Sequence, residues 1–223
     1  MDRFRIVAVA SSAGDREAVS ELLSALPAAC GAAVVIVQHL DGGREMLLDG
    51  PLAKRTAFPV VHAQDGVMPE RDHVYVMRAN TKLTIIAGRF SLTPSASGLH
   101  RPGDTLFASL AEDRAQGAIG VVLSGVGSDG ALGIQAIRKA GGTTFAQYPG
   151  SARFPSMPIS AIETGCVDAV LRPNEIAHEL VRLSRNSASS ADVVLHVALI
   201  DGNPEIRRFD RVAGAVSSQR HGC

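Results

Sequence analysis

Short apolar runs alternate with amphipathic segments near the start of the chain. Residues 4–10 (FRIVAVA) and 32–38 (AAVVIVQ) are apolar runs of the length typical of strands that are buried on both faces. Between them, residues 16–27 place apolar side chains on one helical face. A strand, a helix and a strand in this order predict a βαβ unit, in which the two strands are parallel.

The pattern changes in the middle of the chain and then resumes. Residues 59–94 contain short strand-like runs separated by turn residues, which predicts an antiparallel insertion with a hairpin tip at residues 87–89. Asp104 is expected to be the N-cap of the next helix. Further strands are predicted at 118–124, 143–147 and 167–171, and helices at 105–117, 131–142, 156–165 and 175–186.

We therefore predict an α/β fold: a doubly wound, mostly parallel sheet with helices on both faces and an antiparallel hairpin insertion. One domain is expected to occupy residues 1–185. The segment SASSAD breaks the pattern, so residues 186–223 are expected to form a poorly defined C-terminal tail.

The charge balance narrows the classes of partner. Lys and Arg total 22, as do Asp and Glu, so the formal net charge is zero, which argues against nucleic acid or an anionic membrane as the main partner. No apolar run approaches the roughly 18 residues of a membrane-spanning helix, so direct membrane insertion is not expected. The three cysteines are far apart and form no Cys-x-x-Cys pair, which favours a cytoplasmic protein.

Candidate chemistry lies where the predicted parallel strands end. Ser12, His39 and Asp129 each follow a different strand, and the carboxyl ends of parallel strands meet at one edge of the sheet. A serine, a histidine and an aspartate at one edge are the components of a nucleophile, a base and an orienting acid. Backbone N–H groups near Ser12 and Gly127 are candidate donors to an oxyanion.

Each of these residues also has a structural interpretation. Ser12 lies where serine often caps a helix, His39 ends an apolar strand, and Asp129 is a common turn residue. Ser11 is the neighbour from which the nucleophile must be distinguished, and His100 is the other histidine that we keep as a candidate base.

The stretch GVGSDG, residues 125–130, has the glycine spacing of a dinucleotide-binding loop. That interpretation requires an acidic residue about 20 positions later, at the end of the next strand. The sequence has no acidic residue between Asp129 and Glu163, and the next strand ends in Gln147. The glycines are therefore expected to form a tight turn that holds the Asp129 carboxylate within reach of a histidine.

Over residues 6–183 the chain resembles the catalytic domain of the chemotaxis protein-glutamate methylesterases, the CheB family. The resemblance rests on an ordered set of motifs: VAVASSAGDREAVSELLSALP, VVIVQHL, QDGVMPERDHVYV, HRPGDTLFASLA, GAIGVVLSGVGSDGALGIQAIRKAGGTTFAQ and MPISAIETGCVDAVL. It implies a methylesterase-like catalytic domain, a serine hydrolase that removes methyl esters from receptor glutamates and releases methanol, with glutamine deamidation as a related activity. By position, it implies the triad Ser12, His39 and Asp129, no cofactor, and the cytoplasmic helices of methylated chemoreceptors as partners.

The sequence departs from the family pattern at several positions. Ala13 and Asp15 stand where the serine turn of the family usually has a hydroxyl and a glycine, and Val126 replaces a methionine. These departures motivate a second hypothesis, a catalytically weakened module that binds receptors and transmits a signal. A nucleotide-binding protein is the third. The chain begins directly at the first strand, so the family's receiver domain is not expected, and the sequence names no regulator in its place.

Overall fold

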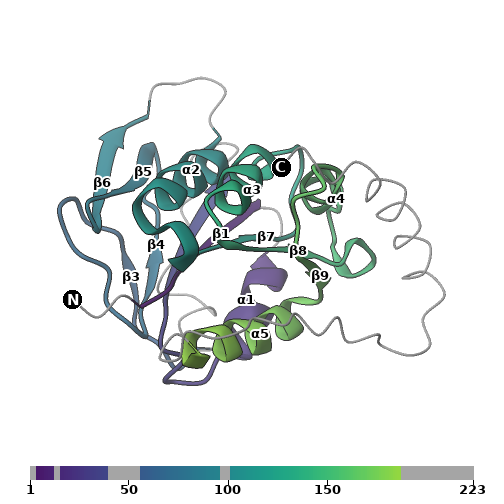
Figure 1. Cartoon of the computed structure of the whole chain (residues 1–223), viewed down its shortest axis with the longest axis horizontal. Helices are drawn as coiled ribbons and strands as arrows, with labels where there is room; N and C mark the ends of the chain where they lie inside the picture. Colours follow the sequence, from purple (N-terminus) through teal and green to yellow (C-terminus); the bar gives the residue numbers. More distant parts are fainter. Residues whose placement is uncertain (1–3, 13–15, 40–55, 96–100, 187–223) are drawn as a thin grey trace.

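The computed structural model describes residues 4–12, 16–39, 56–95 and 101–186, and these residues form a layered α/β structure (Figure 1). The main sheet of this part of the chain has seven parallel strands in the order β3-β4-β2-β1-β7-β8-β9. Their bounds are Ile6–Ser12 (β1), Ala33–His39 (β2), Val60–His62 (β3), Val74–Val76 (β4), Ala118–Val122 (β7), Thr143–Gln147 (β8) and Ala169–Leu171 (β9). Two further strands, β5 (Thr81–Ile86) and β6 (Arg89–Pro94), pair antiparallel as a separate hairpin.

Helices cover both faces of the sheet, as predicted (Figure 1). On β1, Val7 and Val9 pack with α1 (Arg16–Ser24) and α5 (Pro173–Asn186). The alternate side chains Ile6, Ala8 and Ala10 pack toward the opposite layer. That layer contains α2 (Pro102–Arg114), α3 (Ala131–Lys139), α4 (Ser156–Glu163) and the β5–β6 hairpin, with short 3₁₀ turns at η1 (Ala115–Gly117) and η2 (Pro149–Ser151). A sheet buried on both faces explains the nearly continuous apolar runs of its central strands.

The predicted antiparallel insertion was too large. Residues 60–62 and 74–76 belong to the parallel sheet, and only the β5–β6 hairpin is antiparallel. Val74, Tyr75 and Val76 are all buried, because both faces of the sheet are covered at β4: Val74 and Val76 pack in one core layer and Tyr75 packs in the other. Strands of three residues are too short for hydrophobic periodicity to reveal their orientation.

The first strand is shifted by two residues from the prediction of residues 4–10. β1 begins at Ile6 and continues through Ser12, and its backbone pairs with β2 so that Ser12 lies opposite His39. From β1 the sheet extends through β2 toward β4, and it then resumes on the other side of β1 with β7. The loops after β1 and β7 therefore leave the sheet at its topological switch point, where doubly wound proteins place their ligand sites.

Among the described residues, no helix combines the length and the apolar character needed to cross a membrane.

Candidate active site

The ends of β1 and β2 bring the predicted nucleophile and base to the same position along the sheet. Ser12 is partly exposed, and its backbone N–H donates a hydrogen bond to the carbonyl of Ser124 (3.2 Å). His39 is the last residue of β2 and lies opposite Ser12 in the backbone register; its side chain lies outside the described residues. The backbone therefore places Ser12 and His39 at neighbouring strand ends, on the sheet edge where the sequence predicted both.

Ser11 has a different environment from Ser12. Its side chain is 1% exposed, and its hydroxyl oxygen accepts a hydrogen bond from Gln38 Nε2 (3.2 Å). The two serines are consecutive residues of one strand, so their side chains leave on opposite faces of the sheet. Burial and the contact with Gln38 favour a structural role for Ser11.

The Asp129 carboxylate is buried, with the residue 7% exposed, and it is held by the first turn of α2. Oδ2 accepts a hydrogen bond from the N–H of Gly103 (2.9 Å), and Oδ1 accepts one from the N–H of Asp104 (3.0 Å). These N–H groups have no partner within the helix, and the helix dipole favours a negative charge beside them. The helix N-terminus therefore fixes both oxygens of Asp129.

This arrangement corrects the predicted helix start. The helix begins at Pro102, and Asp104 lies in its first turn, so Asp104 is not the N-cap. The N-cap residue, Arg101, makes no side-chain capping bond. Asp129, 26 residues from Gly103 in the sequence, supplies the capping oxygens instead.

Two glycines of the stretch GVGSDG adopt the left-handed conformation that the turn requires. Gly127 has φ 94° and Gly130 has φ 90°, values that are strained for other residues. The Val126 side chain between the first two glycines is 65% exposed. The turn thus directs Asp129 inward against α2 and leaves Val126 at the surface.

Gly125 allows the Asp129 loop to approach the end of β1. A Cβ atom at this position would lie 2.1 Å from Met157 Sδ, 3.0 Å from Ser12 Cβ and 3.1 Å from Ser12 N. Met157 is fully buried, so it has little room to move. The absence of a side chain at Gly125 is therefore a condition for the present position of Ser12.

We expect Gly125→Ala to lower the free energy of unfolding by about 1–3 kcal/mol, because it overpacks a buried site, and to slow serine chemistry by displacing Ser12. Urea unfolding and labelling of Ser12 by a fluorophosphonate measure the two effects. Gly117→Ala is the matched control, since its Cβ would lie 3.7 Å from Arg114 Cβ, an ordinary contact. Equal behaviour of the two variants would contradict the packing argument.

One predicted oxyanion donor is already engaged. The N–H of Gly127 donates to Ser156 Oγ (3.1 Å), and Ser156 Oγ donates to the carbonyl of Gly125 (3.1 Å). The start of α4 therefore braces the loop after β7. The N–H of Gly127 itself is therefore engaged in this structure, and the prediction stays one for the neighbouring N–H groups.

The contacts at α3 do not favour the dinucleotide interpretation. Such a site needs open N–H groups at the helix N-terminus to receive a phosphate. Here the N–H of Gly133, in the first turn of α3, donates to Asp104 Oδ1 (2.8 Å). A carboxylate therefore already occupies the place of the anion.

Sequence reasoning missed several polar residues that support this edge. Gln147 ends β8 and accepts a hydrogen bond from the N–H of Ser124 (2.8 Å), while its amide donates to the carbonyl of Ser151 (3.1 Å). Arg101 donates hydrogen bonds to Ser128, in the loop that carries Asp129, and Asp104 accepts the N–H of Gly133 in α3. The position of Gln147 at a strand end was a usable signal, whereas nothing local marked Arg101.

Ala13, Asp15 and His100 lie outside the described residues, as does the predicted tail beyond residue 186. The effect of Ala13 and Asp15 on the site, and the domain boundary after residue 185, stay predictions.

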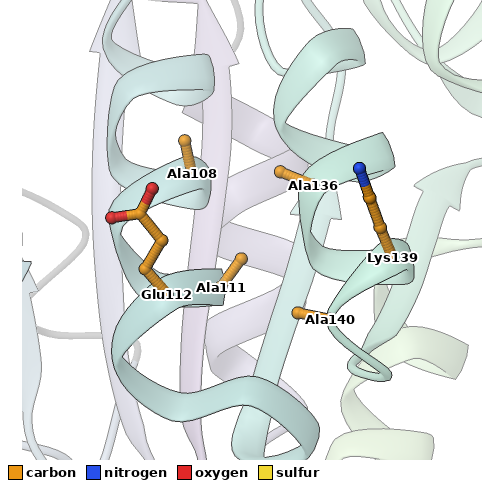
Figure 2. Close-up of a pocket in the computed structure, with 6 residues that line it drawn as sticks. All are labelled: Ala108, Ala111, Glu112, Ala136, Lys139 and Ala140. Carbon is orange, nitrogen blue, oxygen red and sulfur yellow. The ribbon is translucent and has the colours of Figure 1, made fainter.

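A shallow groove on the α2–α3 side of the molecule is separate from this edge. Figure 2 shows it between the two helices, toward their C-terminal halves, whereas Asp129 contacts the N-terminus of α2. Its lining consists of Ala108, Ala111, Glu112, Ala136, Lys139 and Ala140. The groove contains none of the predicted site residues.

Comparisons with known proteins agree with the observed architecture. The family model described as CheB methylesterase matches residues 7–180. Two similar curated relatives are protein-glutamate methylesterase/protein-glutamine glutaminase 3 of Anaeromyxobacter dehalogenans and the corresponding protein 2 of Cupriavidus metallidurans. The first is 38% identical over 182 residues, which are 80% of this chain and 53% of that relative. The second is 38% identical over 180 residues, which are 79% of this chain and 53% of that relative. The chain thus spans about half the length of these relatives.

Among solved structures, the catalytic domain of the Thermotoga maritima CheB methylesterase superposes with a TM-score of 0.74 at 28% sequence identity. The match covers 81% of this chain and 98% of that domain.

Proposed function

The chain belongs to the CheB methylesterase family, and we propose that it is a serine hydrolase that removes methyl esters from glutamate side chains of chemoreceptors. The observation that carries the proposal is the fixed Asp129 carboxylate, beside the strand that places Ser12 opposite His39. The names of the relatives support the substrate class, and those names also include a glutaminase activity. We therefore include deamidation of receptor glutamines in the proposal.

In this proposal Ser12 is the nucleophile. Its hydroxyl oxygen attacks the ester carbonyl, and His39 takes the hydroxyl proton as the general base. His39 then returns the proton to the methoxide leaving group, which departs as methanol. In the second half of the reaction His39 activates a water molecule that hydrolyses the acyl-enzyme and regenerates Ser12.

Asp129 would orient His39 in the tautomer that accepts the Ser12 proton and would stabilise the imidazolium that forms. Its two hydrogen bonds to α2 leave the carboxylate little freedom to turn away. Backbone N–H groups that follow Ser12 remain candidate donors to the oxyanion. The N-terminus of α1, which begins shortly after Ser12, adds a favourable helix dipole at this edge.

Membership of this family also supports our proposal for the partners and the compartment. The cytoplasmic helices of methylated chemoreceptors are the proposed protein substrate, and the cytoplasm is the proposed location. No cofactor is required for ester hydrolysis by a triad.

Covalent labelling tests the choice of serine. A fluorophosphonate probe should modify Ser12, and peptide mapping should find the adduct there, because the proposed base activates that hydroxyl. Ser12→Ala should abolish labelling, whereas Ser11→Ala should retain it, since the Ser11 hydroxyl is buried against Gln38. An adduct on Ser11 would overturn the assignment of the nucleophile.

The substrate class is tested by methanol release from membranes that contain methylated receptors. We expect wild-type protein to release methanol and Ser12→Ala to release none. A protein that binds these receptors without releasing methanol or reacting with the probe would instead be the signalling module to which Ala13, Asp15 and Val126 point. A protein that binds NAD or ATP and shows neither activity would support the nucleotide-binding alternative.

A further inference from the structure

The N-termini of α2 and α3 exchange their capping carboxylates. Asp129, just before α3, accepts hydrogen bonds from the N–H groups of Gly103 and Asp104 in α2. In return, Asp104 Oδ1 accepts the N–H of Gly133 in α3 (2.8 Å). Neither helix receives a side-chain cap from its own N-cap residue. The start of each helix is therefore tied to a carboxylate from the other segment.

Arg101 connects the two carboxylate-bearing segments. Its Nε lies 2.8 Å from Asp104 Oδ2. Its Nη2 donates to the carbonyl of Ser128 (2.7 Å) and to Ser128 Oγ (3.0 Å). Because Ser128 immediately precedes Asp129, Arg101 braces the backbone that carries the Asp129 side chain. We refer to Arg101, Asp104 and Asp129 as the helix clasp.

The charge on Asp104 is not needed to cap α3. Burial raises the pKa of the Asp104 carboxyl above its ordinary value, and the negative charge of Asp129 adds to this, while the Gly133 N–H and Arg101 oppose it. An asparagine would accept the same Gly133 hydrogen bond without the unfavourable burial of a second charge. A carboxylate at this position is therefore explained by its contact with Arg101 rather than by the cap.

We propose that Asp104, held by Arg101, is a positioning residue that keeps the Asp129 carboxylate in the place from which it orients His39. The inference rests on the function proposed above. Asp129 lies in a glycine-rich turn, and two of the glycines that flank it have positive φ, so its own backbone offers little restraint. The clasp supplies that restraint through α2 and through Ser128. Asp104 acts only through Asp129 and is not itself a catalytic residue.

Asp104→Ala tests the proposal, with Asp104→Asn as the conservative variant. We expect the alanine variant to lower kcat by up to about 100-fold, the effect of a displacement of about 1 Å at a reacting group, with KM for the methylated receptor little changed. Asp104→Asn keeps the acceptor for Gly133 and loses the ion pair with Arg101. Its kcat should lie between the values for Asp104→Ala and the wild type.

Asp168→Asn is the matched control. Asp168 Oδ2 accepts the N–H of Thr144 (2.9 Å), and Oδ1 lies 2.9 Å from Arg138 Nη1, so it is also a carboxylate shared by a backbone N–H and an arginine. Its side chain is 12% exposed, compared with 13% for Asp104. Asp168 lies beside the start of β8, whereas Ser12 lies at the carboxyl end of β1, so the two residues are at opposite ends of the parallel strands. Asp168→Asn should affect stability and leave kcat unchanged.

A double-mutant cycle separates positioning from general destabilisation. If Asp104 acts through Asp129, then Asp104→Ala should have almost no further effect on kcat in an Asp129→Asn background. If the fold-losses in kcat of the two single variants instead multiply in the double variant, the proposal is overturned, because Asp104 would then not act through Asp129.

A third measurement does not depend on catalysis. The Gly103 N–H donates to Asp129 Oδ2, so its hydrogen exchange reports the position of the carboxylate. Exchange of this amide should accelerate by about 10-fold in Asp104→Ala and remain unchanged in Asp168→Asn. Unchanged exchange in Asp104→Ala would overturn the proposal even in an active enzyme. A wild-type protein without esterase activity would overturn the proposed function, and Gly103 exchange would still decide whether Asp104 holds Asp129.

Discussion

His39→Ala is expected to lower kcat for ester hydrolysis by about 10⁶-fold, close to the loss seen when a triad hydrolase loses its nucleophile or its base. The serine hydroxyl is a weak nucleophile unless a positioned base removes its proton, and His39 is the residue opposite Ser12 in the β1–β2 register. Steady-state kinetics of methanol release, together with circular dichroism to establish folding, measures the effect.

His62→Ala is the control for this experiment. His62 also ends a parallel strand, but β3 is separated from β2 by β4, so His62 is remote from Ser12 in the sheet order. The His62 variant should keep wild-type activity. Wild-type turnover by a folded His39→Ala protein would move the role of the base to His100 or end the triad hypothesis.

Asp129→Asn is expected to lower kcat by about 10⁴-fold. The amide removes the negative charge that stabilises the imidazolium of His39, and its NH₂ group favours the wrong imidazole tautomer. The structure adds a second effect, since both carboxylate oxygens accept N–H groups of α2. An amide nitrogen would face one of those N–H donors, so we also expect a loss of about 1–3 kcal/mol in the free energy of unfolding.

Urea unfolding and receptor demethylation kinetics measure the two effects of Asp129→Asn separately. Asp168→Asn, which disturbs a comparable carboxylate at the other end of the parallel strands, should reproduce the loss of stability without the loss of turnover. Near-normal turnover in Asp129→Asn would refute the triad assignment. New affinity for NAD or ATP in this variant would instead support a phosphate-binding role for the glycine loop, because a repelling charge would have been removed.

Much of the fold was accessible from local patterns. The apolar runs around Val9 and Ile36 and the amphipathic segment between them predicted parallel strands joined by a helix, and the structure has this arrangement. Once strands are parallel, their carboxyl ends share an edge, and this predicted that Ser12, His39 and Asp129 lie at the same edge of the sheet. The catalytic roles of these residues stay a prediction that the experiments above test.

The limits of the sequence appear where distant segments meet. The three-residue strands β3 and β4 are too short to show a periodicity. They belong to the parallel sheet because Val74 of β4 pairs in parallel with β2 on one side and with β3 on the other. Local rules made Asp104 the cap of α2, but the oxygens that cap it come from Asp129, 26 residues from Gly103. The engagement of the Gly127 N–H by Ser156 depends in the same way on the packing of α4.

The sequence by itself determined which segments become strands and helices, and which edge of the sheet receives Ser12, His39 and Asp129. Periodicity and strand direction are local properties, and each can be read from a short stretch of chain. Only the tertiary structure decided the register that sets Ser12 against His39 and the exchange of carboxylates between α2 and α3. Hydrogen bonds between residues far apart in the chain depend on how whole elements pack, and no local pattern specifies their partners.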